Sequence, residues 1–124
     1  MRHDRAQNIE LAIEAYQRAL SVYHKSDLAI EWAMTQNHLG TAYFEKIPQD
    51  KAENIELAIA AYQLTLEVYT KKDLPYDWAM TQYNLGNAYR KRILGDTTEN
   101  QENAIASYKN ASEIYFHDDF PEDW

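Results

Sequence analysis

The side chains that could do chemistry in this sequence are four histidines, a few serines, many carboxylates and one basic run. The absence of cysteine excludes disulfides, a thiolate nucleophile and Cys-ligated zinc. The three glycines are isolated from one another, so no phosphate-binding loop is present. No triad partners surround the serines, which are Ser21, Ser26, Ser107 and Ser112. We therefore predict no catalytic residues and no enzymatic activity.

Metal ligands are equally sparse. His3, His24 and His38 have no second histidine or carboxylate at ligand spacing. The run His117-Asp118-Asp119 could chelate a cation, but histidine and turn-forming aspartate are also expected at a helix end. We therefore expect neither a bound metal nor a cofactor.

The basic run Arg90-Lys91-Arg92 has two interpretations. It closes a helical pattern, where cations suit the helix dipole, or it contacts an acidic partner. The whole chain has a net charge of −8, which disfavours nucleic acids and anionic membranes as partners. No apolar run approaches the roughly 20 residues that a membrane span needs, and no signal peptide pattern is present. We expect a cytoplasmic protein.

An internal repeat organises the sequence. The hexapeptide Asn-Ile-Glu-Leu-Ala-Ile stands at residues 8–13 and again at 54–59, 46 residues later. The two full copies align with 27 identities over 46 positions, and a third copy is partial. A period of this size is typical of stacked helical arrays. We predict one repeat domain over residues 1–124, with copies at 8–53, 54–99 and 100–124.

Each full copy contains two amphipathic helical patterns. In the second copy, apolar residues from Ile55 to Tyr69 fall at steps of three and four, and a second stripe at this spacing contains Trp78, Gln82, Leu85, Gly86 and Tyr89. Capping boxes are expected where an acid precedes Glu or Gln by three residues, at Asp4 with Gln7, Asp50 with Glu53, and Asp96 with Glu99. The sequence predicts an all-α fold of five helices, near residues 5–25, 28–47, 51–71, 75–94 and 97–117.

These residues resemble the tetratricopeptide repeat. That family carries Leu-Gly-x-x-Tyr on one helix and Ala-x-x-x-Phe-x-x-Ala on the other. The first motif stands here at residues 39–43 and 85–89. The second, with Tyr in place of Phe, begins at Ala12, Ala58 and Ala104, and its final Ala is replaced by Thr65 in the second copy. The resemblance implies an α-solenoid of antiparallel helix pairs, about five helices forming a right-handed superhelical segment.

Two features depart from the family pattern. The period is 46 residues rather than about 34. Gln36 and Gln82 also replace the family's aromatic residue, while Trp32 and Trp78 stand one turn earlier. The chain is therefore similar to a long-helix, bacterial-style variant, related in style to the repeats of kinesin light chains.

The recurring glycines and tyrosines suggest packing positions. A glycine inside a helix costs about 1 kcal/mol relative to alanine, so its recurrence implies a close helix crossing. We expect Gly40 to face Ala58, and Gly86 to face Ala104. The tyrosines that recur in register, including Tyr108, are expected at the edge of the core.

Positions that differ between copies mark a candidate binding face. Residues 37, 41, 44 and 45 differ from their counterparts 46 residues later and lie at helical spacing on one face. In the family, this face lines a concave groove that holds peptides. The resemblance implies a groove formed by Met34, Asn37, Thr41, Phe44, Glu45, Met80, Tyr83, Asn84, Asn87, Arg90 and Lys91. The alternative is ordinary surface drift between copies.

The family's carboxylate clamp is matched only by Asn84 and Asn87, so capture of a chaperone tail is not implied. We expect a scaffold that binds a protein or peptide partner of unknown identity on its concave face. The alternative is a regulatory or oligomerisation segment within a larger bacterial signalling protein. Because neither end of the array shows a polar capping pattern, we expect either a segment of a longer array or self-association through the ends.

Overall fold

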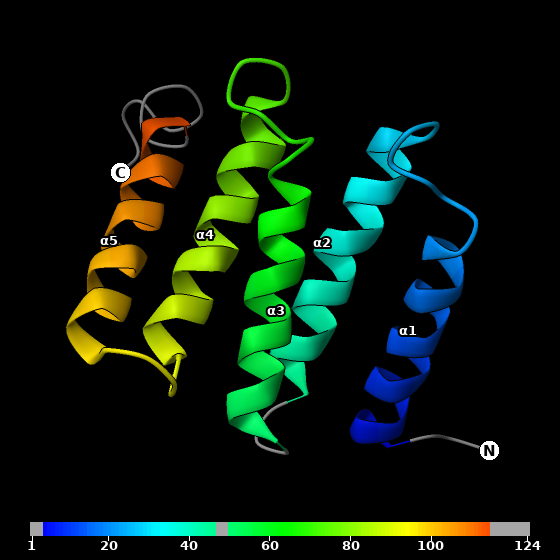
Figure 1. Cartoon of the computed structure of the whole chain (residues 1–124), viewed down its shortest axis with the longest axis horizontal. Helices are drawn as coiled ribbons and strands as arrows, with labels where there is room; N and C mark the ends of the chain where they lie inside the picture. Colours follow the sequence, from blue (N-terminus) through cyan, green and yellow to red (C-terminus); the bar gives the residue numbers. More distant parts are fainter. Residues whose placement is uncertain (1–3, 47–49, 115–124) are drawn as a thin grey trace.

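Five helices arranged side by side make up the computed structural model, which describes residues 4–46 and 50–114. Figure 1 shows them in chain order, each running opposite to the one before it. The described ranges contain no strand, so the predicted all-α class is confirmed. The helices are α1 (Arg5–Leu20), α2 (Ala29–Glu45), α3 (Lys51–Thr65), α4 (Pro75–Lys91) and α5 (Thr97–Ile114).

Helices α1 and α3 end earlier than the apolar spacing predicts. They stop at Leu20 and Thr65, whereas the expected ends were residues 25 and 71. The chain continues as hydrogen-bonded turns, in which the Tyr69 N–H still donates to the Thr65 carbonyl. Tyr69 is therefore buried from a turn rather than from a helix. Buried residues thus continue at helical spacing beyond the last helical residue. The predicted helix ends therefore lay too far along the chain.

The predicted capping boxes have mixed outcomes. Asp4 and Gln7 form a complete box, with each side chain accepting a hydrogen bond from the other's backbone N–H. Asp96 accepts from the Glu99 N–H. The prediction of a capping box at Asp50 is wrong, because this residue has a left-handed backbone (φ 49°) and its side chain makes no capping hydrogen bond.

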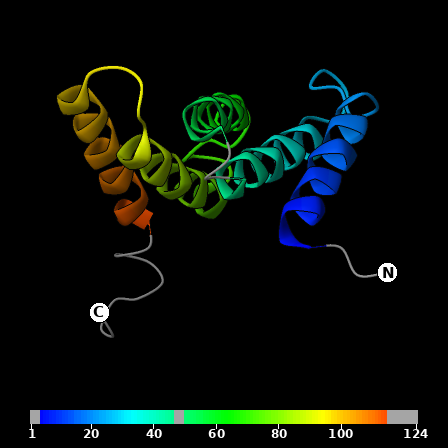
Figure 2. The same cartoon turned by 90° about the horizontal axis from the view of Figure 1, so that it is seen from below.

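Helix packing follows the repeat. The pairs α2–α3 and α4–α5 pack most extensively, and α1–α2 and α3–α4 join the pairs. Figure 2 shows α3 on one side of α2 and α4, with α1 and α5 at the two ends. The larger core cluster joins α3 to α4 through Ile55, Ile59 and Tyr62 on one side and Leu85 and Ala88 on the other.

Polar contacts between helices recur 46 residues apart. Gln17 donates to the Tyr43 hydroxyl, and Gln63 donates to the Tyr89 hydroxyl. Four ion pairs form two sets with the same relation, Lys25–Glu67 with Lys71–Glu113, and Lys46–Glu10 with Arg92–Glu56. Equivalent side chains therefore make equivalent contacts in successive copies.

The expected partners of the recurring glycines were wrong. A Cβ atom built on Gly40 would lie 2.8 Å from the ring of Tyr62, and one built on Gly86 would lie 2.7 Å from the ring of Tyr108. Each tyrosine lies one helical turn after the alanine that we expected. The close approach is therefore between a tyrosine ring and a helix backbone, and it leaves no room for a side chain at the glycine.

This contact predicts unequal costs for two matched substitutions. Gly40→Ala and Gly86→Ala both overpack a tyrosine, which costs about 1–3 kcal/mol in a packed core. Tyr62 is only 2% exposed and cannot swing away, whereas Tyr108 is partly exposed. We expect Gly40→Ala to lower the free energy of unfolding more than Gly86→Ala does, as measured by urea denaturation. Equal stability of both variants and the parent chain would contradict the ring-on-backbone contact.

Candidate functional site

The predicted groove residues do not all reach the surface. Asn37 is buried, and four residues are partly buried: Thr41, Phe44, Asn84 and Asn87. The exposed members are Met34, Glu45, Met80, Tyr83, Arg90 and Lys91. The face predicted from the differences between copies is therefore only partly available to a partner.

Asn37 must be removed from the predicted groove. It is 6% exposed, and its side-chain oxygen has no hydrogen-bond partner among the described residues. Asn37 lies two turns before Phe44 on the same face of α2, and Phe44 contacts α4. Asn37 is therefore enclosed within the fold, while the equivalent residue of α4, Tyr83, is 51% exposed.

Phe44 and Lys91 form a contact between helices. The Lys91 ammonium lies 5.6 Å from the centre of the Phe44 ring, a cation–π arrangement that joins α2 to α4. Phe44 also packs against the core cluster between α3 and α4. These two residues thus help to hold the helices together, and Glu45 beside them remains exposed.

Four side chains of α4 and α5 converge at the surface, and we call them the Tyr108 cluster: Tyr83, Asn87, Arg90 and Tyr108. The Tyr108 hydroxyl donates to the Asn87 side-chain oxygen over 2.6 Å and accepts from Arg90 Nε over 3.3 Å. The Tyr83 ring lies 5.8 Å from the Tyr108 ring, tilted by 52°. Among the described residues Arg90 uses one guanidinium nitrogen, so the cluster combines an apolar ring with further N–H donors.

Tyr108 is the member that sequence reasoning missed, because it was assigned to core packing with Tyr62. The Tyr62 hydroxyl bonds to Thr41 over 3.0 Å and is fully enclosed. In the next copy, Asn87 replaces Thr41 and Tyr83 replaces Asn37. These coupled differences were a signal in the sequence that the surroundings of Tyr108 had changed.

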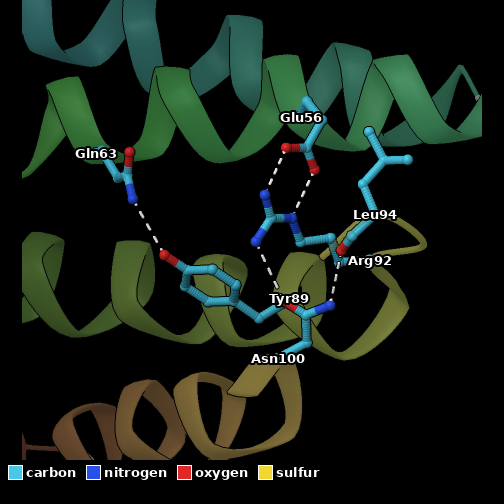
Figure 3. A network of polar contacts seen from close by, with 6 residues as sticks. All are labelled: Glu56, Gln63, Tyr89, Arg92, Leu94 and Asn100. Atoms are coloured by element: carbon cyan, nitrogen blue, oxygen red, sulfur yellow. Dashed lines mark hydrogen bonds and ion pairs between the residues drawn. The ribbon is translucent and has the colours of Figure 1, made fainter. Parts of the chain in front are cut away.

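The basic run is largely engaged within the molecule. Arg92 makes two hydrogen bonds of 2.7 Å to the Glu56 carboxylate and a third, of 3.2 Å, to Asn100, which binds the Leu94 carbonyl (Figure 3). The bonds to Glu56 raise the pKa of the Arg92 guanidinium. This network ties the end of α4 to α3 and α5. It supports the structural interpretation for Arg92 and leaves Arg90 as the cation of the Tyr108 cluster.

No metal centre emerges among residues 4–46 and 50–114, where no three His, Asp or Glu side chains gather in a suitable group. The His38 ring stacks on Tyr16 at 5.6 Å. The candidate His117-Asp118-Asp119 lies outside the described residues. No helix in the described part of the chain is long and apolar enough to cross a membrane.

Comparison with known proteins finds no matching family model, no matching curated protein and no matching solved structure.

The burial of Tyr62 predicts a pH dependence. Burial raises the pKa of this phenol to about 12, against the opposing effect of its hydrogen bond with Thr41. An unfolded tyrosine ionises near pH 10, so the stability that this group contributes is complete below about pH 10 and is lost towards pH 12. We expect Tyr62→Phe to show a shallower loss of stability over this interval in urea melts. A parallel loss in both proteins would contradict an enclosed, protonated Tyr62.

Proposed function

We propose that this chain is a tetratricopeptide-like α-solenoid that acts as a protein-interaction scaffold and has no enzymatic activity. The support for the solenoid is the recurrence of helix contacts at intervals of 46 residues, including the pairs Lys46–Glu10 and Arg92–Glu56. Repeat arrays of this kind expose extended faces to partners, since each repeat contacts only its neighbours. The right-handed superhelix that the resemblance implies is part of this proposal.

The Tyr108 cluster is the observation that carries the binding role. Leu85 and Gly86 of α4, which are identical to their counterparts in α2, are buried. Tyr83 and Arg90 differ from their counterparts in α2 and are exposed. Both side chains contact Tyr108. Packing thus accounts for Leu85 and Gly86, whereas the exposed side chains of Tyr83 and Arg90 are available to a ligand.

The chemistry of the cluster describes the segment that would bind. Tyrosine and arginine are enriched at binding hot spots, because a ring offers area at low entropic cost and a guanidinium forms directional bonds. Met80, one turn before Tyr83 and Asn84, is 39% exposed and adds an adaptable apolar surface. We propose a peptide or protein segment with an apolar side chain against Tyr83 and a carboxylate or carbonyl against Arg90.

One observation favours the alternative of a regulatory or oligomerisation segment in a larger protein. Ile105 of α5 is 53% exposed, whereas the equivalent Ile13 and Ile59 are buried against the helix that follows them. An apolar residue at this packing position suits contact with a neighbouring domain or a second copy. This use of α5 is compatible with a separate ligand on the Tyr108 cluster.

The groove is tested with the double variant Tyr83→Ala/Arg90→Glu. Peptides are selected on the parent chain from a random displayed library, and their affinities are measured by calorimetry. We expect the double variant to weaken binding at least about a hundredfold, because truncation of hot-spot residues costs about 2 kcal/mol or more each. Circular dichroism should remain unchanged, since both residues are exposed.

A matched control changes another face. Lys51→Glu/Leu57→Ala alters exposed residues of α3, with the same change in charge and the same truncation to alanine. This control should bind the selected peptides like the parent chain. Peptides that tolerate the double variant but lose affinity for the control would place the binding site on α3 instead.

A further inference from the structure

A hollow of about 420 Å³ lies between α1 and α2. Its walls include Ala12 and Tyr16 of α1, and His38, Thr41 and Glu45 of α2. Equivalent positions elsewhere in the chain show what this space is shaped to hold, because the contacts recur every 46 residues.

The face of α1 beside the hollow is covered by a helix in both later copies. Ala58, Ala61 and Thr65 of α3 are buried, and α2 packs on them, with the Thr65 hydroxyl reaching the Ala33 carbonyl. The equivalent residues of α5 are buried against α4. On α1, Ala15 is exposed where Ala61 is 4% exposed. Helix α1 thus presents a helix-receiving face with no described helix on it.

Among the described residues, Tyr16 differs from its two counterparts in the same way. Tyr62 and Tyr108 each lie on a glycine of the preceding helix, and each bonds through its hydroxyl to the residue after that glycine, Thr41 or Asn87. Tyr16 meets no such glycine and makes no such bond within the described residues. Its ring stacks on His38 of the following helix instead.

Charge further specifies the occupant. Where α4 adjoins α2, Lys91 lies over Phe44. Glu45 is the counterpart of Lys91 on α2, so a helix in the hollow would place its own counterpart of Phe44 beside Glu45. A cation suits that position, and α4 carries Arg90 there, whereas α2 carries an apolar ring. The sequence of α4 therefore complements the hollow better than that of α2.

We propose that the hollow between α1 and α2 docks an amphipathic helix supplied in trans by a partner protein. The helix has the α4 pattern: a glycine against Tyr16, an amide one residue later for the tyrosine hydroxyl, and a cation three residues further on, beside Glu45. This site continues the helix interfaces of the fold and is separate from the Tyr108 cluster.

The probe is a labelled synthetic peptide with the sequence of residues 72–94, titrated against the full chain by fluorescence anisotropy. We expect saturable binding with one peptide per chain. Ala15→Arg should weaken binding at least about tenfold, because its side chain fills the space that the peptide backbone needs. Ala60→Arg makes the same change at an exposed site of α3 and should leave the affinity unchanged.

A charge exchange tests the register. Glu45→Arg should weaken binding about two- to five-fold, as expected for one exposed ion pair. The peptide carrying Arg90→Glu should bind this variant better than it binds the parent chain. Equal effects of Ala15→Arg and Ala60→Arg, or no recovery in the exchange, would overturn the proposal.

A fusion removes the cost of folding a short peptide. A duplicate of residues 70–95 is placed directly before Asp4, which reproduces the native connection from Gly95 to Asp96. We expect Tm to rise by several degrees, and Gly86→Leu in the duplicate alone to abolish the rise. An unchanged Tm would overturn the proposal. So would a chain that already dimerises, and loses its dimer in Ala15→Arg, because a second copy would then occupy the hollow.

Discussion

The contact between a tyrosine ring and the backbone of the preceding helix is the constraint on which the other packing depends. Tyr62 lies on Gly40, and Tyr108 lies on Gly86, so close that even a methyl group at either glycine would force a shift. The ring sets how near the two helices come and directs its hydroxyl to the residue after the glycine. The paired helices α2–α3 and α4–α5 accordingly form the most extensive interfaces of the chain.

The link between these pairs, α3 on α4, combines an apolar cluster with polar contacts. Gln63 and Tyr89, and the bidentate pair of Arg92 with Glu56, tie α3 to α4 in parallel with the apolar cluster (Figure 3). An ion pair that is about one-third exposed contributes little stability, but a planar guanidinium fork fixes orientation. Ring-on-backbone contacts therefore set the distance between the two helices of a pair. Polar contacts set the register between one pair and the next.

Whether a side chain is exposed depends on its position within the array as much as on its residue type. Ile13, Ile59 and Ile105 are the same residue in three copies, yet two are buried and one is exposed. Tyr62 and Tyr108 contrast in the same way, because the neighbours of the Tyr108 side chain include the exposed Tyr83 and Arg90. The Tyr108 cluster and the hollow beside Tyr16 both lie where a repeated contact differs among the described residues.

The sequence by itself determined the helical class, the five helices, the period of 46 residues and the two patterns within each copy. The helical features are local, since apolar spacing and the Asp4 cap depend on residues within a few turns, and the period can be read by comparing the copies. Only the tertiary structure decided which residues are covered. It removed Asn37 from the candidate face, engaged Arg92 with Glu56, and moved the partner of Gly40 from Ala58 to Tyr62. The physical reason is that burial depends on which helix lies alongside, and helical periodicity carries no information about that neighbour.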